Sequence, residues 1–159
     1  MGSFTVGISD LKVCRAPDVV VTYALGSCIG ICMADTVAGV GGLSHIMLPD
    51  STQALNGKDM PMRFADTAVP MLIQQLVAMG ASRSRLTAKI AGGAVMFAAA
   101  SDRFNIGERN IEAVTEALKK ANIPIVARDV GLNYGRTVFF YPETGMMEVK
   151  AASKGVKQL

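Results

Sequence analysis

Short apolar segments separated by turn-forming residues fill the first part of this chain, and they restrict it to folds built on β-strands. Residues 19–23 are β-branched and aromatic, a composition typical of a strand. Residues 29–33 alternate large and small side chains, which predicts a strand crowded on one face. Further strands are predicted over residues 4–8, 43–48, 85–90, 123–130 and 137–141, with a last one ending near Lys150.

Two later segments carry apolar residues at helical spacing. The predicted buried faces are Ala65, Ala68, Leu72, Leu76 and Met79 in the first helix, and Ile111, Val114, Leu118 and Ala121 in the second. Gly80 suits the position after the end of the first helix. Pro70 marks either the first turn of that helix or a kink within it. Many strands interleaved with two main amphipathic helices predict a single α+β domain over residues 1–159.

The connecting segments have turn and loop composition. Residues 37–42 are rich in glycine and are predicted to form a turn. Residues 51–63 are polar and contain Asn56-Gly57 and Pro61, so they predict a mobile surface loop close to His45. Residues 150–159 carry three of the lysines and are expected to be a solvated, frayed tail.

Composition excludes several classes of function. The net charge of +3 is too small to indicate a nucleic-acid partner. No apolar run is long enough to span a bilayer, so no membrane insertion is expected. The first residues lack the layout of a secretory signal, which favours a cytoplasmic protein. An odd number of cysteines, Cys14, Cys28 and Cys32, fits a reducing compartment, and one histidine beside them is too little for a structural zinc site, so no metal is expected.

Three residues could take part in catalysis, namely Cys28, His45 and Thr22. Cys28 follows Gly26-Ser27, a turn that can leave the cysteine N–H free as half of an oxyanion hole. His45 is the single histidine, so it must be the base in any thiol chemistry. The Thr22 hydroxyl could orient the imidazole ring. The alternative is that His45 is a satisfied core or rim histidine and Cys28 is inert packing in an apolar strand, which spacing alone leaves open.

Five sequence blocks resemble the CheD family, the chemoreceptor glutamine deamidases of bacterial and archaeal chemotaxis. The blocks are Gly26-Ser27-Cys28, residues 43–49 (LSHIMLP), 64–68 (FADTA), 89–94 (KIAGGA) and 105–110 (NIGERN). They occur in family order, and the resemblance covers about residues 6–149 as a core, with 150–159 as a tail. It implies that Cys28, His45 and Thr22 are the catalytic residues, with Gly26 and Ser27 as candidates for the turn and oxyanion site.

The resemblance also implies a function and a fold. The expected reaction is deamidation of glutamines on the cytoplasmic helices of chemotaxis receptors to glutamate and ammonia, without a cofactor, with hydrolysis of receptor methyl esters as a further activity. The expected fold is a layered β-rich core with outer helices, similar to toxin-type cysteine deamidases. CheC, a chemotaxis phosphatase, is an expected second partner. Candidates for the substrate or partner surface are Gly92, Gly93, Phe97 and Phe104.

Two other functions are compatible with parts of the sequence. The chain could act as an adaptor that binds receptors or CheC with little catalysis, although a pure adaptor has no need for Thr22, Cys28 and His45. The glycines at 39–42 or 92–93 could belong to a phosphate or nucleotide site. Neither glycine segment has the form of a dinucleotide-binding motif or a P-loop, which argues against this function.

Overall fold

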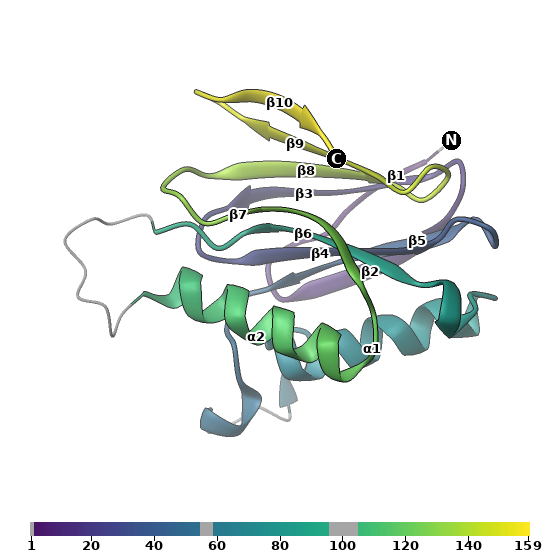
Figure 1. Cartoon of the computed structure of the whole chain (residues 1–159), viewed down its shortest axis with the longest axis horizontal. Helices are drawn as coiled ribbons and strands as arrows, with labels where there is room; N and C mark the ends of the chain where they lie inside the picture. Colours follow the sequence, from purple (N-terminus) through teal and green to yellow (C-terminus); the bar gives the residue numbers. More distant parts are fainter. Residues whose placement is uncertain (1, 55–58, 96–104) are drawn as a thin grey trace.

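The computed structural model describes residues 2–54, 59–95 and 105–159, and it has three layers (Figure 1). Two five-stranded sheets stack on one another, and helices α1 (Ala65–Ala78) and α2 (Ile106–Lys120) cover the free face of one of them. We call the sheet between the helices and the other sheet the central sheet, and the remaining one the outer sheet. This arrangement confirms the predicted α+β class.

Both sheets are mixed, with one parallel pair in each. In the outer sheet the order is β1 (Ser3–Thr5), β3 (Val19–Leu25), β8 (Arg136–Tyr141), β9 (Met146–Ala151) and β10 (Gly155–Gln158). In the central sheet it is β2 (Asp10–Arg15), β5 (Val40–Ile46), β4 (Ile29–Asp35), β6 (Thr87–Gly92) and β7 (Ile125–Val130). The parallel pairs are β1 with β3 and β6 with β7.

The middle of the central sheet is buried on both faces. Every residue of β4 and β5 is buried. The large residues Ile29, Ile31 and Met33 of β4 pack in the core beneath the helices, whereas the smaller Cys32 and Ala34 belong to the core between the two sheets. The predicted crowding of this strand on one face is therefore confirmed, and the crowded face is the one toward the outer sheet.

The glycine-rich segment 37–42 is not a turn throughout, because β5 already begins at Val40. Gly42 lies in the strand, where an added β-carbon would come within 2.8 Å of the Lys12 carbonyl oxygen and 2.9 Å of a Leu72 methyl group. Glycine is needed here for close packing of strand and helix rather than for a turn. Strand β2 was not predicted.

The last residues of the chain are not a frayed tail. Strand β10 pairs antiparallel with β9, with Gly155 opposite Ala151. The Lys89 ammonium group donates a hydrogen bond of 2.7 Å to the Leu159 carbonyl oxygen. These bonds fix a segment whose side chains are exposed and which therefore lacks the apolar alternation that marks a strand in the sequence.

Both predicted helices are present. Helix α1 begins at Ala65 and continues past Pro70, so Pro70 lies beyond the first turn and the first-turn alternative is wrong. Part of the predicted 51–63 loop is a short 3-10 turn at Ser51–Gln53, capped by the Asp50 carboxylate. Residues 55–58 of that loop, together with Phe97 and Phe104, lie outside the described residues.

Candidate functional site

The structure brings Thr22 and His45 together in the space between the two sheets. Thr22 lies on β3 of the outer sheet and His45 on β5 of the central sheet. Both side chains are buried, and the Thr22 Oγ1 and His45 Nδ1 atoms are 2.7 Å apart. A contact at that distance is a hydrogen bond, and it links two layers that share no strand pairing.

Counting protons fixes the direction of this hydrogen bond. Thr22 Oγ1 also lies 2.7 Å from the Val6 carbonyl oxygen, which can only accept. A hydroxyl has one proton, so Thr22 donates it to Val6 and accepts a proton from His45 Nδ1. His45 is therefore held as the tautomer that carries its proton on Nδ1, and its Nε2 lone pair is free.

The environment keeps the imidazole neutral. Burial lowers the pKa of His45 from 6.5 to about 4. Its Nε2 atom is buried and has no hydrogen-bond partner among the described residues. A neutral ring with an unoccupied Nε2 lone pair can accept a proton from a suitable donor.

Cys28 lies on the same side of the central sheet as His45. His45 is paired with Gly30 across β4 and β5, and Cys28 precedes Gly30 by two positions, the spacing of residues that share a face. Consistent with this, Cys28 packs against the core between the sheets. Diagonal neighbours on one sheet face have Cα atoms about 7–8 Å apart, within reach of an imidazole and a thiol. Gly30 places no side chain between them.

The Cys28 thiol is neutral at rest. Burial raises the pKa of Cys28, and a hydrogen bond from its own backbone N–H opposes this increase. The side chain is partly exposed, unlike those of Cys14 and Cys32. The site thus holds a partly exposed, neutral thiol and a neutral base on one face of the central sheet rather than a preformed ion pair.

The turn before β4 is held through its carbonyl groups. The Gly26 oxygen accepts from the Ala94 N–H at 2.9 Å, and the Cys28 oxygen accepts from the Gly93 N–H at 2.8 Å. The Ser27 oxygen accepts from the Asn110 side chain at 2.9 Å. All three carbonyl groups are therefore occupied by donors from neighbouring segments.

The turn does not depend on an unusual conformation at Gly26, contrary to the expectation from sequence. Gly26 has no positive φ, whereas Ala24 adopts a left-handed φ of 57°. Ala24 lies at the irregularity of β3 between Thr22 and Leu25. The irregular backbone before Cys28 is therefore at Ala24, four residues earlier, and not at Gly26.

Gly92 and Gly93 are buried against Cys28. At Gly92, with φ +113°, an added β-carbon would overlap the Cys28 carbonyl oxygen. At Gly93 it would come within 2.5 Å of the Ile111 side chain. The structure shows both glycines in contact with the site, and their part in a partner surface stays a prediction.

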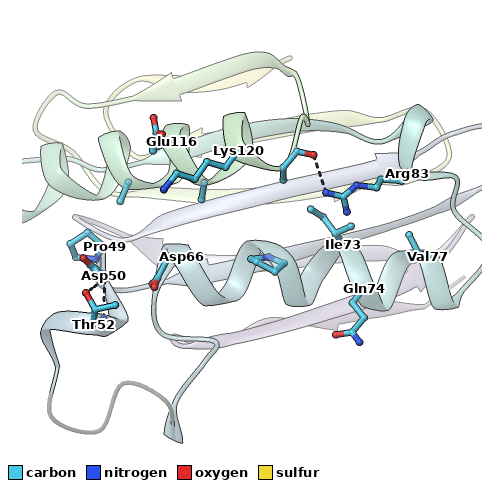
Figure 2. A pocket seen from close by; sticks show the side chains of 14 residues that line it. Pro49, Asp50, Thr52, Asp66, Ile73, Gln74, Val77, Arg83, Glu116 and Lys120 are labelled. Atoms are coloured by element: carbon cyan, nitrogen blue, oxygen red, sulfur yellow. Dashed lines mark hydrogen bonds between the residues drawn. The ribbon is translucent and has the colours of Figure 1, made fainter.

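A groove lies between α1 and α2 (Figure 2). Its lining includes Asp66 and Ile73 of α1 and Glu116 and Lys120 of α2, and none of the predicted site residues. In the described parts of the chain, no three His, Cys, Asp or Glu side chains are grouped so that they could hold a metal ion. None of the described helices is long and apolar enough to cross a membrane.

We predict that Gly92→Ala displaces Cys28. The new β-carbon would push on the Cys28 backbone, whereas Gly80→Ala meets the same strain in φ (+110°) with open space around it. The strain in φ costs of order 1–3 kcal/mol in either variant. Urea unfolding should show a larger loss of stability for Gly92→Ala, and iodoacetamide should alkylate Cys28 at an altered rate in that variant alone. Equal stability losses and equal alkylation rates in the two variants would show that Gly92 does not position Cys28.

Comparison with known proteins identifies the family. A family model described as CheD chemotactic sensory transduction matches residues 47–151. A protein of Lachnoclostridium phytofermentans named "Probable chemoreceptor glutamine deamidase CheD" is 47% identical over 156 residues, covering 97% of this chain and 96% of the relative. Proteins with the same name from Caldanaerobacter subterraneus subsp. tengcongensis and Clostridium botulinum strain Hall are each 48% identical, with the same coverage. The resemblance inferred from the sequence blocks is confirmed, and the chain belongs to the CheD family.

Proposed function

We propose that this protein deamidates glutamine side chains of chemotaxis receptors, with Cys28 as nucleophile, His45 as base and Thr22 as the residue that orients His45. The names of its relatives support the substrate and the reaction. The observation that carries the mechanism is the 2.7 Å contact of Thr22 with His45 Nδ1, which leaves Nε2 free on the sheet face that Cys28 shares.

The first step joins the thiol to the substrate. Sulfur of Cys28 forms a bond to the carbon of the glutamine side-chain amide, and His45 Nε2 takes the thiol proton. The carbonyl π electrons move to oxygen, and the Cys28 N–H is the donor that we assign to that oxyanion. The depressed pKa of His45 ensures that Nε2 is unprotonated when substrate arrives.

The following steps release ammonia and then free the side chain from Cys28 as glutamate. When the oxyanion collapses, the C–N bond breaks, and the imidazolium of His45 gives its proton to the departing nitrogen. Water then attacks the thioester carbon while His45 takes a proton from it. The C–S bond breaks, the thiol regains its proton from His45, and the product is a glutamate side chain. No cofactor enters any step.

Three narrower points belong to the same proposal. A glutamate methyl ester on the receptor would follow the same steps with methanol as the leaving group. This protein would bind the receptor helices and CheC, the expected second partner, in the cytoplasm. The likeness to toxin-type deamidases, which rests on the layered β-rich fold with outer helices, stays a prediction.

The Cys28→Ala variant should release no ammonia from purified receptor while keeping its fold. Cys14→Ala is the matched control, because it removes a buried thiol at the far end of the central sheet. Ammonia release and mass spectrometry of receptor glutamines measure the effect. A normal rate in Cys28→Ala would contradict the mechanism. Receptor binding by the wild-type protein without any ammonia release would instead favour an adaptor.

The Thr22→Val variant should lose activity through misorientation of His45. Valine has nearly the shape of threonine but lacks the oxygen that accepts from Nδ1, so we expect kcat to fall by about 10–100-fold with KM unchanged. Thr22→Ser keeps the hydroxyl and should retain most of the activity. If Thr22→Val and Thr22→Ser were equally active, the hydroxyl would have no role in orienting the ring.

A further inference from the structure

We propose that Asn110 is the positioning residue that fixes the distance between the Cys28 turn and the segment that follows His45. The inference rests on the proposed function, which it deepens. Asn110 lies on α2 and is fully buried. It touches neither the thiol nor the imidazole in the described contacts, so it would act through the backbone that carries them.

The two protons of the Asn110 side-chain amide are shared between the two segments. Nδ2 donates to the Ser27 carbonyl oxygen at 2.9 Å and to the Met47 carbonyl oxygen at 3.0 Å. Ser27 directly precedes Cys28, and Met47 follows His45 by two residues. One rigid, planar group thus holds a fixed separation between the backbone before the nucleophile and the backbone after the base.

This bridge lies where the strand pairing stops. The register of β4 and β5 ends with Ile29 opposite Ile46, so the residues beyond have no ladder partner across the pair. The Met47 N–H turns away instead and donates to the Arg63 carbonyl oxygen. Asn110 therefore replaces the next rung of the ladder at the point where the strands separate and where the thiol is located.

The first turn of α2 brings Asn110 to this position. The Asn105 side chain caps the helix by accepting from the Glu108 N–H. Gly107 packs directly on the backbone of Gly93 and Ala94, where a β-carbon would overlap the Ala94 carbonyl oxygen. Gly107 and Asn110 are three positions apart and share the buried face of α2. Close packing at Gly107 therefore places the Asn110 side-chain amide near the Ser27 and Met47 carbonyl groups.

Stability alone explains this asparagine poorly. Its Oδ1 atom is buried and has no hydrogen-bond partner among the described residues. A buried acceptor without a partner is costly, and a core position would ordinarily be filled by an apolar side chain. What the amide provides at that cost is a pair of N–H donors aimed at two separate backbone segments.

Two substitutions at Asn110 test the proposal against a matched control. Asn110→Leu has a similar shape without donors, and Asn110→Asp becomes a donor only when its carboxyl group is protonated. Val114→Ala is the control, since Val114 is buried on the same helix and belongs to the core beneath it, so it lowers stability without touching either segment. Each variant is assayed for kcat and KM on receptor at a temperature where unfolding measurements show it to be folded.

Asn110→Leu should lower kcat by about 100-fold with KM unchanged, because a displacement of about 1 Å between reacting groups has that effect. Burial beside two carbonyl oxygens raises the pKa of an introduced carboxyl group, so Asn110→Asp regains one donor as the pH falls. The ratio of its kcat to that of the wild type should therefore rise between pH 8.5 and pH 5.5, while the ratio for Asn110→Leu stays flat. Val114→Ala should keep the wild-type kcat.

The proposal is overturned if folded Asn110→Leu keeps kcat within about threefold of wild type, since misplacement alone should lower kcat about 100-fold. It is also overturned if Val114→Ala lowers kcat as much as Asn110→Leu does. A flat pH ratio for Asn110→Asp overturns it as well, and this series decides the matter if Asn110→Leu does not fold. Failure of the proposed function has a different signature, which is undiminished ammonia release by Cys28→Ala.

Discussion

The site depends on one hydroxyl group, that of Thr22, which is shared between the Val6 carbonyl and the His45 ring. This group joins the outer sheet to the central sheet at a point where no strand pairing connects them. Because the carbonyl takes its proton, the hydroxyl can only accept from Nδ1, and so it determines which nitrogen of His45 is free. A neutral group orients the ring without raising its basicity, which is consistent with the lowered pKa of His45.

Around this bond, the fold holds Cys28, the proposed nucleophile, by the backbone of its turn. Gly93, Ala94 and Asn110 occupy the carbonyl groups of the turn that ends at Cys28, and the side chain of Cys28 is left to face the imidazole side of the sheet. Both partners are neutral at rest, the thiol through a raised pKa and the ring through a lowered one. In the proposed mechanism, transfer of the Cys28 proton to His45 therefore accompanies attack on the substrate amide, and the thiol stays neutral until a glutamine is bound.

Much of the fold and the candidate residues could be predicted from sequence, and the failures have physical reasons. Alternation and helical spacing located most strands and both helices, but β10 escaped because its side chains are all exposed. Gly41 and Gly42 were assigned to a turn because a glycine required for close packing looks the same in a sequence as a turn glycine. The sequence suggested Thr22 beside His45, and the structure places them in contact. It could not indicate Val6, which acts through its backbone, or Asn110, whose partners lie 83 and 63 positions away.

The state of His45 is the most direct test of this arrangement, and the presence of a single histidine makes it accessible. NMR of nitrogen-labelled protein reports the protonation of each ring nitrogen without any need for assignment among several histidines. The structure predicts a proton on Nδ1 and a bare Nε2, with titration of the ring near pH 4 rather than 6.5. A proton on Nε2 at neutral pH would contradict the proposed role of Thr22, and titration of the ring near 6.5 would contradict the burial that keeps His45 neutral.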